Sequence, residues 1–284
     1  MRQRWLPVRV DDYDAWLADV FLEAAQRLGV APCTPATSVA DNIGGPVLYK
    51  GERVWLRVAP FHENGMDREA WTGIRDAAVL SGIHKPTLLG SVEWAHTQPV
   101  NVPVCADLMT LATDPVAAPG SQYLATPITL SPRWLGDLRA SLDALATHPT
   151  DRTFWAHCAE RYRYLLHAVY GRPLPSGIEP TWGSTEHLDL HWGNVTVPNL
   201  MILDWEHWGV GVTGYGAARL YCTALAVPEV AERVYATFAD VLDSPSGRYA
   251  QLVAAADILV NVAYYEDTVD LCSALHQLAK KILG

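Results

Sequence analysis

Apolar residues near the start of the chain recur at helical spacing. Four of them, from Trp16 to Leu28, are spaced four residues apart, with acidic residues at the start of the segment. Gly29 follows directly and is typical of a helix end. This pattern predicts an amphipathic helix over residues 12–28. We expect its apolar side to pack against the domain that follows.

The pattern then changes to short apolar runs bounded by turn residues, as in a β-sheet. Four runs are predicted as strands: 47–50, 54–58, 87–94 and 102–106. The sequence Asn42-Ile43-Gly44-Gly45-Pro46 precedes the first run, and glycine next to proline predicts a turn there. Residues 68–81 return to helical spacing. The first part of the chain is therefore predicted to be mainly β, with two helices.

The rest of the chain is predicted to be mainly helical. Residues 111–131, rich in Ala, Pro and Thr, predict a loop. Helical patterns follow in five segments: 133–146, 152–170, 217–226, 228–242 and 248–281, the last with breaks. The chain is thus expected to belong to the α+β class.

One stretch, from His187 to Asp204, concentrates the candidate chemistry. Residues 195–197 and 201–203 are predicted to be short strands joined over Pro198-Asn199. Such a hairpin would fold Asp204 back towards Asn194, and Asp189 lies five residues before Asn194. Two acids and an amide would then face one small volume. Phosphoryl transfer needs such a set, with an acid for the acceptor hydroxyl and oxygen ligands for Mg²⁺.

The pattern His187-x-Asp189-x-x-x-x-Asn194, followed by Ile202-Leu203-Asp204-Trp205-Glu206, resembles a known family. It is similar to the catalytic loop and metal-binding acid of the aminoglycoside phosphotransferase and choline-kinase-like family, the small-molecule relatives of protein kinases. The resemblance implies a two-lobed protein-kinase-like fold. We expect a nucleotide-binding N-terminal lobe over residues 1–107 and a catalytic, acceptor-binding lobe over 108–284.

The resemblance also implies roles for residues of the second lobe. Asp189 would orient and deprotonate the acceptor hydroxyl, and His187 would steady the catalytic loop by hydrogen bonding. Asn194 and Asp204 would hold Mg²⁺ on the phosphates of ATP. Glu206 is a further candidate for the metal or the substrate. The implied function is ATP- and Mg²⁺-dependent phosphorylation of a hydroxyl on a small molecule.

In the first lobe, relatives cover the ATP phosphates with a strand-turn-strand, which would place Gly44 and Gly45 near them. Arg57 stands where kinases have the phosphate-binding lysine, with Glu69 as the candidate partner that orients it. An exposed surface pair is the alternative for these two residues. The segment Asp107-Leu108-Met109 would be the crossing between the lobes, with adenine held by its backbone groups.

Three departures from the family pattern leave a second function open. Arg57 replaces lysine, Leu188 stands where glycine is common, and Gly216 stands where relatives have an acid that ties the catalytic loop to the next helix. The alternative is a catalytically inactive pseudokinase, acting as a nucleotide-binding or scaffolding module in a biosynthetic assembly. The acceptor itself stays open: an aminoglycoside, another antibiotic, an amino alcohol, a sugar or a modified peptide.

Composition narrows the classes of partner. The formal net charge is −10 over 284 residues, and no block of Lys and Arg occurs, which argues against nucleic acid. An acidic surface favours a cationic small-molecule acceptor, although many ordinary proteins are equally acidic. No GxSxG or Walker-type motif and no zinc-ligand spacing is present among the five cysteines. Without a signal-peptide or transmembrane pattern, we expect a cytoplasmic protein with no membrane partner. The oligomeric state is not encoded in any recognisable pattern.

Overall fold

The computed structural model describes residues 12–39, 42–61, 68–97, 101–261 and 268–284. By internal contacts the chain divides into two compact units. The first unit comprises residues 1–79 and 86–113, and the second comprises 80–85 and 114–284. The boundary thus falls after Thr113, later in the chain than the predicted boundary at residue 107.

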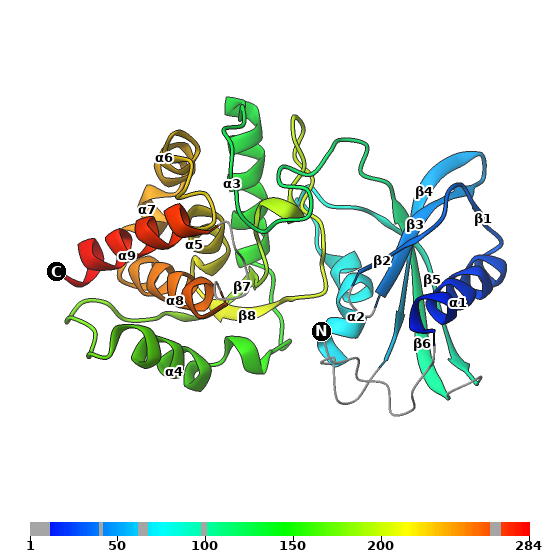
Figure 1. The fold of residues 1–284 in the computed structure, drawn as a ribbon, viewed down its shortest axis with the longest axis horizontal. Helices are drawn as coiled ribbons and strands as arrows, with labels where there is room; N and C mark the ends of the chain where they lie inside the picture. The colour runs from blue at the N-terminus through cyan, green and yellow to red at the C-terminus, as the bar shows by residue number, and fades with distance from the viewer. Residues whose placement is uncertain (1–11, 40–41, 62–67, 98–100, 262–267) are drawn as a thin grey trace. The chain divides into compact units, whose positions relative to one another are not determined.

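The first unit is built on an antiparallel sheet, coloured blue to cyan-green in Figure 1. Its strands are β1 (Ala31–Pro32), β2 (Thr37–Val39), β3 (Asn42–Tyr49), β4 (Glu52–Pro60), β5 (Leu88–His96) and β6 (Val102–Thr110). They lie in the order β1-β3-β4-β6-β5, and β2 also pairs with β3. Two strands predicted at 54–58 and 102–106 therefore occupy the centre of the sheet.

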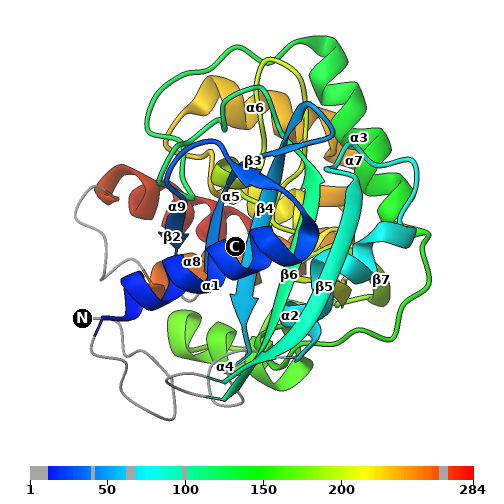
Figure 2. The same ribbon diagram turned by 90° about the vertical axis from the view of Figure 1, so that its right-hand side faces the viewer.

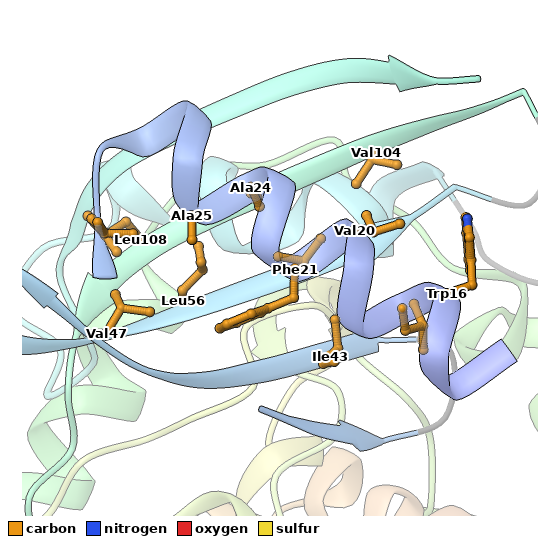
Figure 3. Packing of buried hydrophobic residues seen from close by; sticks show 14 of the residues in the cluster. Trp16, Val20, Phe21, Ala24, Ala25, Ile43, Val47, Leu56, Val104 and Leu108 are labelled. Atoms are coloured by element: carbon orange, nitrogen blue, oxygen red, sulfur yellow. The ribbon is translucent and has the colours of Figure 1, made fainter. Parts of the chain in front are cut away.

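Helix α1 (Tyr13–Leu28) covers one face of this sheet, as Figure 2 shows. Asp12 caps its start by accepting a hydrogen bond from the Ala15 N–H, and Gly29 ends it in the left-handed conformation. Its apolar side buries Val20 and Phe21 against the alternate residues of the strands that face it, among them Leu56 (Figure 3). The predicted amphipathic helix is confirmed.

The opposite face of the sheet carries the polar residues. Strand side chains alternate between faces, so Arg57 points away from Leu56 and its neighbours on the α1 side. Helix α2 (Arg68–Asp76) packs on this second face, because Trp71 is buried against Ala59 and Cys105; its indole N–H also donates to the Ala59 carbonyl at 2.8 Å. The predicted helix 68–81 ends earlier than expected, and a 3₁₀ turn follows over Ala77–Val79.

Two predictions about this unit are wrong. Gly44 and Gly45 do not form a turn but lie inside β3, paired with Arg57 and Leu56 of β4. A Cβ at position 44 would come within 2.7 Å of the Trp55 ring, so the absence of a side chain at Gly44 permits close packing within the sheet. The segment Asp107-Leu108-Met109 is not a crossing either, because all of it pairs with β4 as part of β6.

The second unit is mainly helical, with one small sheet. Its helices are α3 (Pro132–Ala146), α4 (Ala159–Tyr170), α5 (Tyr215–Cys222), α6 (Pro228–Thr237), α7 (Ala239–Leu242), α8 (Pro245–Asn261) and α9 (Val269–Leu283). The sheet pairs β7 (Trp182–His187) with β8 (Trp208–Val212), and α4 and α5 both pack against the buried helix α8 (Figure 1). Strand β8 was missed in the sequence because its alternate glycines indicate a loop.

Several helix limits differ from those expected. The segment 152–170 begins as a helix only at Ala159, because Arg152 is buried before it and donates to the Trp208 carbonyl at 3.0 Å. The predicted helix 248–281 includes residues 262–267, which lie outside the described residues. No helix in the described part of the chain combines the length and apolar character that a membrane span requires.

Candidate active site

His187 joins the two halves of the predicted motif. It is fully buried at the end of β7. Its Nδ1 accepts a hydrogen bond from the Asp189 N–H at 3.3 Å, and its Nε2 lies 3.0 Å from the Leu203 carbonyl, to which it donates. Burial lowers the pKa of His187 to about 4, so the ring is neutral at pH 7 with its proton on Nε2. The neutral ring therefore fixes the backbone directly before Asp204 to that of Asp189.

The buried neutral state of His187 makes stability depend on pH. In the unfolded chain histidine binds a proton as the pH falls below about 6.5, whereas the folded chain binds it only near pH 4. The unfolded state therefore holds more protons in this window, and the folded state loses stability as the pH falls. Because of His187, we expect the free energy of unfolding to fall by about 2 kcal/mol between pH 7 and pH 5.

Urea denaturation of wild type and His187→Asn at both pH values checks this expectation. The variant should show the smaller loss between pH 7 and pH 5, while substitution of the exposed His167 should leave the wild-type difference intact. Comparing the variants with wild type cancels the contribution of other titrating groups to the pH dependence. One such group is Glu186, whose pKa is raised by burial. Equal pH dependence in wild type and His187→Asn would contradict a buried neutral imidazole.

The predicted hairpin is present in a very short form. Val195 and Ile202 form an isolated antiparallel bridge, and the Leu203 N–H donates to the Asn194 carbonyl at 2.8 Å. The indole N–H of Trp134 on α3 donates to the Thr196 carbonyl, which anchors the hairpin to the helical unit. These contacts return the chain so that the residue directly before Asp204 is bonded to Asn194, as the sequence predicts.

Asn194 is held with its amide oxygen free. Its Nδ2 donates to the Asp189 carbonyl at 3.0 Å. Nδ1 of the neighbouring His191 accepts the Gly193 N–H, and its Nε2 lies 3.2 Å from Nδ2 of Asn194 and 3.6 Å from the Asp189 carboxylate. No described residue donates to Oδ1 of Asn194. That oxygen is available to a cation.

Asp204 has a positive φ angle, a backbone conformation that is uncommon outside glycine, although aspartate adopts it more often than most residues. Its φ angle is +59°, and the residue is exposed. Such a conformation costs about 1–3 kcal/mol and is concentrated at functional sites. It directly follows the hairpin, at an exposed position. Strain at this position supports a functional role for the carboxylate.

The described residues contain no group of three His, Cys, Asp or Glu side chains that could hold a metal by themselves. Mg²⁺ does not require one, because it commonly takes one or two protein oxygens and completes its shell with phosphate and water. Asn194 and Asp204 fit such a partial site. The backbone carbonyl of Glu206 accepts from Arg152 at 3.3 Å, and its side chain is half-buried; its metal role stays a prediction.

The link that the resemblance implies for an acid at position 216 is made in this structure by Glu186. Its buried carboxylate accepts the N–H groups of Gly214 and Gly216 at 2.9 and 3.0 Å. These N–H groups belong to the start of α5, where unpaired backbone donors and the helix dipole favour a negative charge. The acid thus reaches from β7 to α5. Gly216 leaves the connection intact.

Leu188, the second departure, is explained by packing. It is buried, its N–H donates to the His207 carbonyl at 2.8 Å, and its side chain lies against Gly211 of β8. A Cβ on Gly211 would lie 3.0 Å from a Leu188 methyl group. The larger side chain before Asp189 is therefore matched by the absence of a side chain at Gly211 on the neighbouring strand.

Arg219 is the main residue that the sequence did not indicate. It is buried on α5, and its guanidinium contacts Asp189 at 3.1 Å, Asp257 of α8 at 3.0 Å and the Gln122 side chain at 3.1 Å. A lone arginine in the otherwise small and apolar segment Tyr215–Cys222 was the available signal. Charged side chains in such helices are almost always paired.

The surroundings of Asp189 keep it ionised. Burial alone would raise the pKa of its carboxyl, but the hydrogen bond from His191 and the charge of Arg219 outweigh burial and hold the pKa well below its usual range. The side chain still exposes 29 % of its surface. Asp189 is therefore a permanent, oriented carboxylate that a bound molecule can reach.

In the first unit, Arg57 and Asp107 are direct neighbours across β4 and β6. The Arg57 Nη1 lies 3.5 Å from the Asp107 carboxylate, and both side chains are buried. Glu69 lies in the first turn of α2 with an exposed side chain. Its pairing with Arg57 stays a prediction, and so does a nucleotide role for Met109, which is buried in β6.

A pocket of about 420 Å³ opens elsewhere in the second unit. It is lined in part by Tyr221, Tyr235 and Lys281, from α5, α6 and α9. None of the sequence-predicted site residues lines it, so it does not help to place the acceptor.

Comparison with solved structures decides the fold. Aminoglycoside phosphotransferase APH(4)-Ia matches with a TM-score of 0.58 and 13 % identity, over 94 % of this chain and 98 % of that one. The chain has the protein-kinase-like fold. Amicoumacin kinase hAmiN, solved with AMP-PNP, Ca²⁺ and its ligand, matches with a TM-score of 0.55 and 11 % identity, over 94 % of both chains. A putative fructosamine-3-kinase from Haemophilus somnus gives 0.53 and 10 % over 95 % of this chain and 98 % of that one.

No protein-family model matches the sequence, and no curated protein matches it either. Identities of 10–13 % in these structures establish the fold and leave the chemistry to the residues. The predicted two-part kinase-like architecture, with a sheet-rich first part and a helical second part, is confirmed.

Proposed function

We propose that this protein transfers the γ-phosphoryl group of ATP to a hydroxyl group of a small molecule, with Mg²⁺. The observation that carries the proposal is a set of hydrogen bonds around Asp189: His187 joins it to the backbone before Asp204, and the Asn194 amide donates to its carbonyl. Kinase-like transfer depends on positioning and electrostatics, without a covalent intermediate. A connected acid, amide and second acid provide that positioning.

Asp189 would act on the acceptor. Its carboxylate is ionised, partly exposed and held from one side by Arg219. An acceptor hydroxyl that donates to it would be aligned for attack, and the carboxylate would take up the hydroxyl proton as the oxygen bonds to phosphorus. The low pKa makes orientation the larger part of this role, because a strongly stabilised carboxylate is a weak base.

Asn194 and Asp204 would hold the metal. Oδ1 of Asn194 accepts no hydrogen bond from the described residues, and Asp204 is exposed in a strained conformation. Bound Mg²⁺ and ATP would supply the transferable phosphoryl group and the charge neutralisation that its transfer needs. In the first unit, Arg57 is the candidate cation for the nucleotide phosphates.

The acceptor is proposed to be a small molecule, with cationic compounds favoured. The net charge of −10 attracts cations at long range. One related structure is described as a ternary complex with ADP and hygromycin B, and another as a complex with ADP and spectinomycin. These ligands belong to those proteins and serve here to choose the first compounds for a screen.

The metal assignment predicts that Asp204→Ala abolishes the stabilisation that Mg²⁺ and ATP give together. At about a hundred times its dissociation constant, a ligand adds about 2.7 kcal/mol of stability. Thermal melting with and without Mg²⁺–ATP measures this gain. Asp270→Ala, which removes an exposed acid from α9, should retain the full shift. An equal shift in wild type and Asp204→Ala would remove Asp204 from the metal site.

An ATP-consumption screen tests the function itself. Pools of hydroxyl-bearing small molecules, cationic ones first, are added to the wild-type protein with Mg²⁺ and ATP. Acceptor-dependent ADP release supports the proposal and identifies the pool. A protein that binds ATP but consumes none with any pool would instead be a nucleotide-binding pseudokinase.

A further inference from the structure

A buried charge cluster in the first unit is centred on Asp107. Its carboxylate is fully buried and faces three elements of the unit. The Ser91 hydroxyl of β5 donates to it at 2.8 Å, Arg57 Nη1 of β4 lies at 3.5 Å, and Arg75 Nε of α2 lies at 3.6 Å. A single carboxylate thus holds together two strands and a helix around the candidate phosphate-binding arginine.

The cluster brings two guanidinium groups to one buried carboxylate. Arg57 and Arg75 both approach Asp107, while Glu93, which also pairs with Arg75, is half exposed. The adjacent Cys105 adds no charge, because burial raises the pKa of its thiol to about 12.

We propose that Asp107 is the positioning residue for Arg57 in nucleotide binding, and that Arg75 couples helix α2 to the same carboxylate. The inference rests on the proposed function. Asp107 thereby takes, from the neighbouring strand, the orienting role that the sequence suggested for Glu69 on the helix. The charges are the reverse of those in the expected Arg57–Glu69 pair: here the helix contributes a cation, Arg75, and the sheet contributes the acid, Asp107.

Geometry favours Asp107 over Glu69 for this role. Asp107 is the direct cross-strand neighbour of Arg57, so the backbone pairing itself brings the side chains together. A buried acid next to a guanidinium is restrained by packing and by Ser91. Glu69 is exposed on the first turn of α2, where holding an ion pair in one geometry costs side-chain entropy and water screens the charges.

Titration with ATP and with adenosine tests the positioning role. Asp107→Asn keeps the shape of the side chain and removes its charge, so Arg57 loses its orienting partner. We expect ATP affinity to fall by about tenfold or more, the usual effect of losing a hydrogen bond to a charged group. Adenosine affinity should change by less than about twofold, because adenosine has no phosphate for Arg57 to contact. Asp76→Asn, at the exposed end of α2, is the matched control.

A milder variant covers the case in which Asp107→Asn does not fold. Ser91→Ala removes only the hydroxyl that donates to Asp107, and should weaken ATP binding in the same phosphate-dependent way by a smaller factor. The double variant Arg57→Met/Asp107→Asn should bind ATP no more weakly than Arg57→Met alone, since Asp107 acts through Arg57.

Three results overturn the assignment. Equal losses for ATP and adenosine would make the role of Asp107 structural. A larger ATP loss in Glu69→Gln than in Asp107→Asn would return the role to the helix acid. Wild-type ATP affinity in both Asp107→Asn and Ser91→Ala would exclude any role in binding. If wild type itself binds no nucleotide, the proposed function fails first, and the assignment falls with it.

Discussion

Asp189→Asn is expected to reduce phosphate transfer by about 10²–10⁴-fold, the usual contribution of an acid–base group in the transition state. Asparagine keeps the shape of the side chain but lacks the charge that orients the acceptor hydroxyl, and it cannot take up the acceptor proton. ATP and Mg²⁺ should still bind, because the proposed metal ligands are Asn194 and Asp204. The rate is measured with an acceptor from the screen, at saturating ATP.

Asp257→Asn is the matched control for this substitution. Asp257 contacts the same guanidinium as Asp189, and the two side chains expose 28 % and 29 % of their surface. Both variants therefore remove one charged partner of Arg219, but only Asp189 is proposed to act on the acceptor. Similar rates in both variants would show that the loss comes from Arg219 and would contradict a direct role for Asp189.

Arg219→Ala is expected to lower the free energy of unfolding by about 3–5 kcal/mol. Removing the arginine leaves two partly buried carboxylates facing each other without a cation, and broken buried pairs have costs of this size. It also removes the connection between α5 and Asp189. Urea denaturation at pH 7 measures the change.

Arg139 provides a matched control, because it is an arginine near the surface that also pairs with two aspartates. These are Asp143 and Asp240, and the Arg139 side chain is 31 % exposed compared with 7 % for Arg219. Arg139→Ala should cost about 1 kcal/mol or less, as exposed pairs do. Equal destabilisation by the two substitutions would contradict the view that Arg219 is a buried structural cation.

The parts of the site that follow from short-range chemistry were predictable from sequence. Asp189, Asn194 and Asp204 lie within sixteen residues, and turn residues between two short apolar runs predict the hairpin that brings the last two close. The helix over residues 12–28 has a strong period, a capping acid and a terminal glycine. In each case the deciding interactions join residues near in the chain.

The parts that were missed depend on partners far apart in sequence. Glu186 meets Gly214 and Gly216 only because β7 and β8 pair, and Arg219 reaches back thirty residues to Asp189. Neither link leaves a local pattern. From sequence, Gly216 therefore looked like the loss of a restraint. In the structure Glu186 supplies that restraint.

Glycine caused the main errors of fold. Gly44 and Gly45 next to proline are typical of a turn, but β2 and β4 pair with β3 on both sides and keep it extended. The glycines of β8 admit Leu188 and the Arg152 backbone at short range. Glycine permits both a tight turn and close packing, for different reasons. Only the tertiary structure shows which of the two applies at a given position.

Single-turnover transfer of labelled γ-phosphate from ATP to the acceptor found in the screen tests the central claim most directly. Wild type with Mg²⁺ should move the label to the acceptor, and Asp189→Asn should bind the same ATP but transfer the label at least about a hundredfold more slowly. Bound ATP whose label reaches no acceptor in the wild type would contradict a phosphotransferase. That result would instead identify the protein as a nucleotide-binding pseudokinase.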